Sequence, residues 1–247
     1  MTDYIEKQQI FQQWFSHCRR IVFFGGAGIS TESGIPDFRS VDGLYHQEYA
    51  YPPEVILSHT FFKNKPEQFF HFYRHKMLYP KAEPNAAHLA LAAWERQGKL
   101  SAVITQNIDG LHQAAGSVNV LELHGSVQRN TCLQCGRTYG LEAILNSVDV
   151  PYCICGGIIK PDVVLYEEPL NTLVWKRAEC SVREADMLIV GGTSLAVYPA
   201  ASLLHDYLGD KLVLINRTPT SYDSRASLVI HGSLGEILSA VNMRKQI

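Results

Sequence analysis

Four of the six cysteines lie in two close pairs, a spacing that is typical of a metal site. The pairs are Cys132-x-x-Cys135 and Cys153-x-Cys155, and seventeen residues lie between them. Two thiolates on each of two tight turns can converge on one tetrahedral zinc ion, although the second pair is one residue shorter than the usual knuckle. Because neither pair contains a histidine or a carboxylate, we expect a closed, structural four-thiolate site. Two unrelated pairs of buried thiols are the alternative.

A glycine-rich turn, Gly25-Gly26-Ala27-Gly28-Ile29-Ser30, directly follows the apolar run Ile21–Phe24. Glycines after a strand let backbone N–H groups approach a phosphate, and a helix that starts there would add its dipole. The dehydrogenase fingerprint G-x-G-x-x-G is incomplete, because Thr31 stands where the third glycine belongs. The stretch Gly43–Glu48, where a ribose-binding acid would end a second strand, shows no strand pattern. The turn therefore fits a simple NAD-dependent dehydrogenase poorly.

Three further polar segments could contact a ligand. Pro36 prevents Gly34–Arg39 from continuing a helix, so this loop must cross the phosphate-binding end of the sheet, although its residues alone favour a buried Phe38 and a surface Arg39. Thr105–His112 begins where a strand ends, and its amide and carboxylate groups suit ribose hydroxyls and a carboxamide. His124 ends another apolar run, where a histidine is either structural or a general base with a pKa near about 6.5.

The elements that must position these residues alternate between apolar runs and helical patterns. The apolar runs are Ile21–Phe24, Ala102–Ile104, Val120–Leu123, Met187–Val190, Leu212–Ile215 and Leu228–Ile230. The helical patterns include an amphipathic opening helix through Ile10–Cys18 and His88–Gln97 before the second run. This alternation predicts an α/β fold with a doubly wound parallel sheet. Residues 41–84 are expected to form a helical insertion, and residues 127–160 a small zinc-binding module.

Composition excludes several classes of protein. The 247 residues include 22 basic and 24 acidic side chains, a formal charge of −2, and 46% are hydrophobic, so intrinsic disorder and collagen-like structure are excluded. This charge gives no basic footprint for nucleic acid. The N-terminus lacks the pattern of a secretory signal, and the uncharged stretch 187–204 contains Gly191, Gly192 and Pro199, which would break a membrane helix. We expect a cytoplasmic protein.

Taken together, the motifs resemble those of sirtuins, the NAD-dependent protein lysine deacylases, and in particular the compact bacterial members. Besides the two cysteine pairs, the matching motifs occur in the family's order and are Gly26–Ser30, Gly34–Arg39, Thr105–Asp109, His124-Gly125 and Gly192-Thr193-Ser194. The resemblance runs from about residue 20 to 235 and departs at Gly25, where sirtuins often have threonine. It implies a Rossmann-like NAD-binding domain made of residues 1–40, 85–126 and 161–247, which carries the two insertions.

The resemblance also implies a role for individual residues. It implies that NAD is bound by Ala27, Thr31, Phe38, Arg39, Gln106, Ile108, Asp109, His124, Thr193, Ser194, Asn216 and Leu234. Asp109 would accept from the carboxamide, Phe38 would shield the nicotinamide end, and Gln106 and Asn107 would orient the ribose and an ordered water. His124 would be the general base, with Asn107 as its catalytic companion. Cys132, Cys135, Cys153 and Cys155 would hold one structural zinc ion.

The implied reaction transfers the acetyl group of acetyl-lysine to ADP-ribose and releases nicotinamide, O-acetyl-ADP-ribose and free lysine. The substrate backbone would add as a strand between Val163–Glu167 and Leu195–Val197. Sirtuins that remove succinyl groups carry Tyr-x-x-Arg in the acyl pocket, whereas this chain has Tyr73-Arg74-His75-Lys76. Lysine lacks the fork that grips a carboxylate, so we expect acetyl to be preferred to succinyl. The partners would be acetylated proteins or peptides, with neither nucleic acid nor membrane, and the protein is expected to be a monomer.

Other functions remain possible from the sequence. A mono-ADP-ribosyltransferase or a deacylase of longer acyl groups would use the same NAD site. A non-enzymatic zinc-ribbon binding module would explain the cysteines, but it would leave the glycine turn and Thr105–Asp109 without a purpose. The basic residues Arg129, Arg137 and Lys160 near the cysteines are too few for nucleic acid binding.

Overall fold

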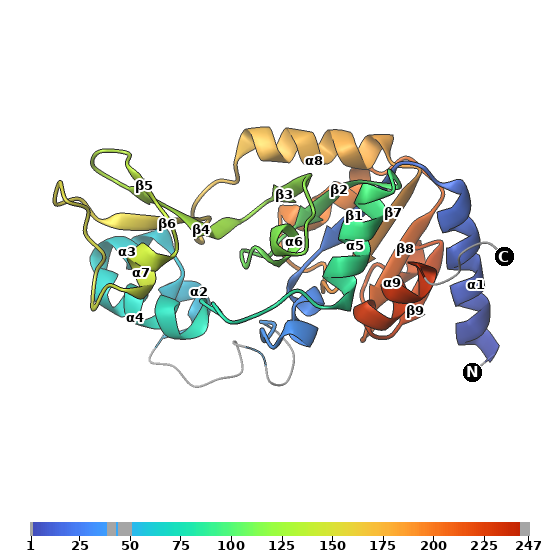
Figure 1. Cartoon of the computed structure of the whole chain (residues 1–247), viewed down its shortest axis with the longest axis horizontal. Coiled ribbons are helices and arrows are strands. Elements are labelled where there is room, and N and C mark those ends of the chain that lie inside the picture. The colour runs from blue at the N-terminus through green and yellow to red at the C-terminus, as the bar shows by residue number, and fades with distance from the viewer. Residues whose placement is uncertain (1, 39–42, 44–50, 243–247) are drawn as a thin grey trace.

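The computed structural model describes residues 2–38, 43 and 51–242 of the chain (Figure 1). Arg39, expected from the sequence to contact NAD, lies outside the described residues, as does much of the first part of the expected helical insertion. Among the helices that the structure describes, none is both long and apolar enough to cross a membrane.

Six parallel strands form the central sheet, which confirms the predicted fold class. They are β1 (Ile21–Gly25), β2 (Leu100–Thr105), β3 (Val120–Glu122), β7 (Met187–Gly191), β8 (Leu212–Asn216) and β9 (Leu228–His231). Their order is β3-β2-β1-β7-β8-β9, so the direction of winding reverses between β1 and β7. In doubly wound sheets, ligands bind in the crevice outside the carboxyl ends of the strands at such a reversal.

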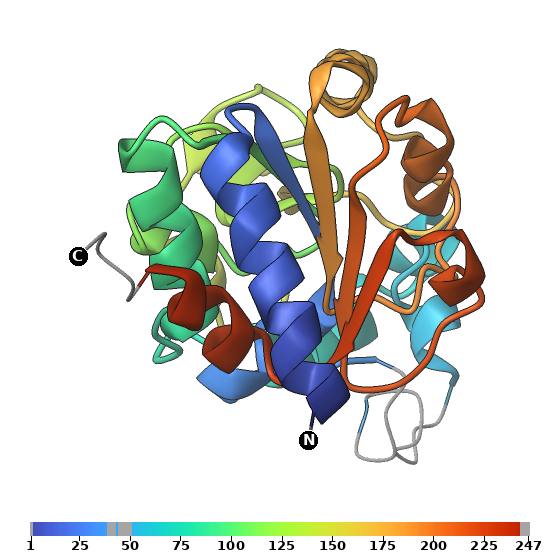
Figure 2. The same ribbon diagram turned by 90° about the vertical axis from the view of Figure 1, so that its right-hand side faces the viewer.

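Helices cover both faces of this sheet (Figure 2). The covering elements are α1 (Thr2–His17), α5 (Ala86–Arg96), α9 (Leu234–Asn242), α8 (Thr172–Glu184) and the 3-10 helix η4 (Ala200–Asp206). Ile21 and Phe23 of β1 pack with α1, α5 and α9, whereas Val22 and Phe24 pack on the opposite face with α8 and η4. Because both faces are buried, the strands are continuously apolar rather than alternating.

A second, smaller core lies at the end of the molecule opposite α1 (Figure 1). Its elements are α2 (Pro53–Ile56), α3 (His59–Asn64), α4 (Pro66–Lys76), β4 (Gly125–Cys132), β5 (Thr138–Tyr139), α7 (Glu142–Leu145) and β6 (Ile159–Val163). The three strands form an antiparallel sheet in the order β5-β4-β6. Phe69 and Phe70 of α4 share one apolar cluster with Cys132, Cys153 and Ile159, so the helices and the cysteine-bearing sheet support each other. The domain boundaries expected from the sequence stay predictions.

Two buried histidines lie between α5 and α6 (Leu111–Ala114), a short helix that follows β2. The His88 and His112 rings are 4.8 Å apart, and within the described residues neither nitrogen of His112 has a hydrogen-bond partner. Burial lowers the pKa of His88 to about 4 and that of His112 to about 3. Both side chains are therefore neutral in the folded protein near pH 7, but they bind protons in the unfolded chain below about pH 6.5.

The free energy of unfolding is expected to fall as the pH is lowered from 7 to 5. Since the folded pKa values are depressed, the unfolded state binds more protons in this window, and each histidine removes about 2 kcal/mol of stability by pH 5. Urea unfolding at both pH values measures the change. Because the cysteines and His124 also take up protons, the readout is the difference between wild type and His112→Leu, which should lose only the contribution of His112, about 2 kcal/mol between pH 7 and pH 5. Equal pH dependence in the two proteins would contradict this explanation.

Candidate active site

One cavity of about 1890 Å³ brings most of the expected site residues together. It lies at the carboxyl ends of β1, β2, β7 and β8 and continues to the smaller core, where Tyr73 of α4 and Val163 of β6 line it. The cavity thus follows the crevice that the strand order predicts. Because its lining residues come from both parts of the molecule, the cavity has room for a dinucleotide and a second substrate.

The glycine turn and the loop after β7 cross in close contact. Gly28 N–H donates to the Gly192 carbonyl at 2.8 Å, and a Cβ on Gly28 would lie 2.8 Å from Gly192 Cα. Two 3-10 helices follow, η1 (Ala27–Ile29) and η2 (Thr31–Ser33), rather than the α-helix whose dipole the sequence suggested. Gly28 is therefore needed for the contact between the two loops, and its N–H is already used within the protein.

Ser30 connects two residues expected at the nicotinamide end of the site. Its hydroxyl donates to Asp109 Oδ2 at 2.7 Å and accepts from Asn107 Nδ2 at 3.0 Å. Asp109 Oδ1 accepts from the Leu111 N–H at 2.9 Å, which fixes the carboxylate. Burial raises the pKa of Asp109, and these hydrogen bonds oppose the rise. The sequence analysis included Ser30 only as part of the glycine motif. A single serine gives no sequence pattern that would identify it as a positioning residue.

His124 lies in the same cavity, directly before β4. Its Nδ1 is 2.9 Å from the Gln106 carbonyl oxygen, which can only accept, so Nδ1 carries the proton and Nε2 is left to accept one. Burial lowers the pKa of His124, which keeps the imidazole neutral. The next residue, Gly125, has φ +78°, and a Cβ there would overlap the Asp162 carbonyl of β6. The turn that aims His124 therefore depends on a glycine.

Gln106, Thr193 and Asn216 form a chain of polar contacts across the ends of β2, β7 and β8. Gln106 Nε2 donates to Thr193 Oγ1 at 3.1 Å, and the Thr193 N–H donates to Asn216 Oδ1 at 3.1 Å. Asn216 Nδ2 is buried and has no hydrogen-bond partner within the part of the chain that the structure describes. An orphaned donor beside the cavity fits a ligand rich in hydroxyl and phosphate acceptors, as NAD is.

The remaining residues expected to bind NAD also line the cavity, apart from Arg39. They are Ala27, Thr31, Phe38, Ile108, Ser194 and Leu234. The Thr31 hydroxyl donates to the Gly28 carbonyl at 3.0 Å, so it supports the glycine turn. Their place on the cavity wall is compatible with the expected contacts, and each individual contact stays a prediction.

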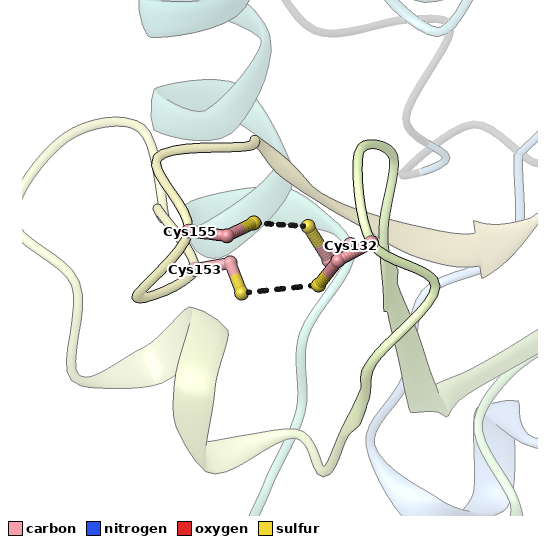
Figure 3. A group of neighbouring side chains, drawn as sticks. Cys132, Cys153 and Cys155 are labelled. Atoms are coloured by element: carbon pink, nitrogen blue, oxygen red, sulfur yellow. Dashed lines mark hydrogen bonds between the residues drawn. The ribbon is translucent and has the colours of Figure 1, made fainter.

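The four paired cysteines converge as their spacing predicts (Figure 3). Their sulfur atoms all lie within 4.8 Å of one another, with Cys132 and Cys155 at 3.5 Å and Cys135 and Cys153 at 3.6 Å. Sulfur atoms on a tetrahedral zinc ion with bonds of about 2.3 Å are about 3.8 Å apart, so the cluster fits one ion. The backbone N–H of Cys155 and the Tyr139 hydroxyl lower the pKa of Cys153 to about 6. All four candidate ligands are cysteine sulfurs, which suits a structural zinc ion.

Comparisons with known proteins cover nearly the whole chain. A family model described as the Sir2 family matches residues 26–199. A Clostridium acetobutylicum protein named NAD-dependent protein deacetylase is 59% identical over 225 residues, which are 90% of this chain and 92% of that protein. A solved Sir2 complex with a p53 peptide and NAD⁺ has a TM-score of 0.84 and 40% identity, covering 95% of this chain and 96% of that one. Another Sir2 complex, with deacetylated p53 peptide and 3'-O-acetyl ADP-ribose, has a TM-score of 0.87, 39% identity and the same coverage.

Proposed function

Since the chain belongs to the Sir2 family and is an NAD-dependent protein deacetylase, we propose that it deacetylates lysine side chains with His124 as the general base. The observation that supports this role is the hydrogen bond between His124 Nδ1 and the Gln106 carbonyl at 2.9 Å. It fixes the tautomer in which Nε2 is basic, and His124 is one of the residues that line the cavity. NAD consumption and peptide deacetylation in the same reaction test this function.

The other residues of the cavity would bind and orient. Bound NAD would supply a ribose carbon to accept the acetyl oxygen, with nicotinamide as the leaving group, and a ribose hydroxyl as the second nucleophile. Asp109, held by Ser30, would accept from the carboxamide N–H₂ of NAD, while Asn107 and Gln106 would orient the ribose. Phe38 would shield the nicotinamide end from water. His124 Nε2 would take the proton of the ribose hydroxyl, which makes it a stronger nucleophile toward the acyl carbon.

The acetylated peptide would enter between two segments at the outer part of the cavity. Val163–Glu167, which begins at the last residue of β6, lines the cavity, and so does Val197 of the second segment. An extended peptide can add to exposed backbone of this kind as a strand. We propose acetylated lysine within protein or peptide chains as the substrate, bound to a monomer in the cytoplasm. No nucleic acid is required, because basic side chains do not dominate the described wall of the cavity.

We expect acetyl peptides to be turned over faster than succinyl peptides. Tyr73 and Lys76 line the cavity, whereas the Arg74 guanidinium faces α7 and donates to the Ile144 carbonyl and Ser147 Oγ. No arginine of the Tyr73–Lys76 stretch is therefore aimed at the acyl group, and a lysine ammonium lacks the bidentate fork for a carboxylate. Competition between the two peptides, followed by mass spectrometry, measures the ratio. A preference for succinyl would overturn this assignment, and ADP-ribose attached to protein would favour the transferase alternative.

A further inference from the structure

Glu167 combines an unusual backbone conformation with a specific contact of its side chain. Its φ is +75°, in the left-handed region that favours glycine, and it is one of only two such non-glycine residues in the described part of the chain. Its Oε2 accepts from the Thr60 N–H at 2.9 Å and from the Thr60 hydroxyl at 2.7 Å. These hydrogen bonds lower the pKa of Glu167, so the carboxylate stays ionised.

The two carboxylate contacts offset a real backbone cost. A left-handed conformation is unfavourable for a residue with a side chain, and it persists only where the surroundings hold it. Hydrogen bonds to a charged group are stronger than those between neutral groups, although solvent weakens them at an exposed site such as this one. Glycine would take this backbone conformation without cost. A glutamate at this position therefore indicates that its contact with Thr60 of α3 matters in its own right.

The neighbours of Glu167, Tyr166 and Glu168, also contact the start of α3. The His59 N–H donates to the Tyr166 carbonyl at 3.0 Å, and the His59 ring contacts Glu168 Oε1 at 2.9 Å. Glu168 Oε2 in turn accepts from Lys160 of β6 at 3.1 Å. Glu167 and Glu168 thus join the segment after β6 to the start of α3 on one side and to the cysteine-bearing sheet on the other.

We propose that Glu167 is a positioning residue for the acetylated peptide, acting through Thr60. Tyr166 and Glu167 line the cavity where the peptide would bind. The contact between Glu167 and Thr60 therefore fixes the backbone segment with which the peptide would pair as a strand. This proposal rests on the proposed function. It concerns the peptide and not NAD, because the NAD-binding residues lie at the ends of β1, β2, β7 and β8, on separate elements.

The test compares Glu167→Ala, Glu167→Gly and Thr60→Val by steady-state kinetics with an acetyl-lysine peptide and NAD. Glu167→Ala should raise the KM for peptide about tenfold, with kcat and the KM for NAD within about twofold of wild type. Glu167→Gly should do the same although it removes the backbone cost, and Thr60→Val, which keeps the N–H, should raise it about threefold. Combining Thr60→Val with Glu167→Ala should add nothing further, because both remove one contact.

Matched controls separate this role from a general loss of structure or charge. Glu54 of α2 carries the same charge and lines a hollow of about 420 Å³ together with Thr60 and Glu167, but it does not line the main cavity. Glu54→Ala removes a nearby charge and leaves the contact between Glu167 and Thr60 in place, so it should leave the KM for peptide unchanged. Circular dichroism checks that each variant is folded. A wild-type KM in Glu167→Gly would overturn the proposal, since backbone conformation alone would then explain Glu167→Ala. An unchanged KM in Thr60→Val would overturn it too.

Hydrogen exchange of residues 163–168 tests the contact independently of activity. Exchange in this segment should speed up in both Glu167→Ala and Thr60→Val, but not in Glu54→Ala. If wild type showed no deacetylation while exchange responded in this way, the proposed function would fail and the contact would stand. If wild type were active and the hydrogen exchange of all variants matched that of wild type, the positioning role of Glu167 would be refuted and the proposed function would be retained.

Discussion

Replacing His124 with alanine is expected to lower the rate of deacetylation by about 10²–10⁴-fold, the usual contribution of a general base. The buried imidazole is neutral, its Nδ1 is held by the Gln106 carbonyl, and Nε2 is its only basic atom. No other histidine lines the described part of the cavity to take its place. Product formation followed by mass spectrometry at saturating NAD and peptide measures the loss.

The same variant should keep the step that precedes base catalysis. Departure of nicotinamide does not need a proton to be removed by His124, so exchange of labelled nicotinamide into NAD should continue in the presence of acetyl peptide. His112→Ala is the matched histidine control for chemistry, because His112 lies outside the cavity wall, and it should retain deacetylation wherever it remains folded. Deacetylation by His124→Ala at more than a tenth of the wild-type rate would contradict the assignment of the base.

Loss of zinc is expected to have the second largest effect, on stability and activity together. Cys132 and Cys153 belong to the same apolar cluster as Phe69, Phe70 and Tyr73 of α4. Four thiolates without an ion would repel one another or take up protons, and the cluster would open. Because Tyr73 lines the cavity, disorder in this core would reach the acyl site. Cys132→Ser should therefore lose bound zinc, lower the Tm by about 10 °C or more, and abolish most of the activity.

Metal analysis of the purified protein should give one zinc ion per chain for wild type and close to none for Cys132→Ser. Cys180→Ser is the control, because Cys180 is an exposed cysteine of α8 outside the four-sulfur cluster. It should keep zinc, Tm and activity. A Cys132→Ser protein that lost its zinc but kept full activity would show that the ion does not support the site.

The fold could be predicted from the sequence because its signals are local and repeated. The strands β1, β7 and β8 in the middle of the sheet are buried on both faces, so Ile21–Phe24 and Met187–Val190 appear as uninterrupted apolar runs. The paired cysteines were equally visible, because a zinc site needs short, fixed spacings within each pair. The position of His124 followed from the rule that ligands bind at the carboxyl ends of parallel strands.

Other features depend on contacts between distant segments and left no local signal. Ser30 reaches Asp109 across 79 residues, and Thr60 reaches Glu167 across 107. The Arg74 side chain turns toward Ser147, which a spacing argument on α4 alone cannot foresee. The shared core of the helical and cysteine-bearing segments was also unexpected, because the sequence separates them into two insertions.

Product analysis of the wild-type protein with NAD and an acetyl-lysine peptide tests the central claim most directly. Mass spectrometry should find nicotinamide, O-acetyl-ADP-ribose and deacetylated peptide in equal amounts, because each turnover moves one acetyl group to one ADP-ribose. Omission of NAD should leave the peptide fully acetylated. Free acetate in place of O-acetyl-ADP-ribose, or ADP-ribose attached to protein while the peptide keeps its acetyl group, would contradict the claim.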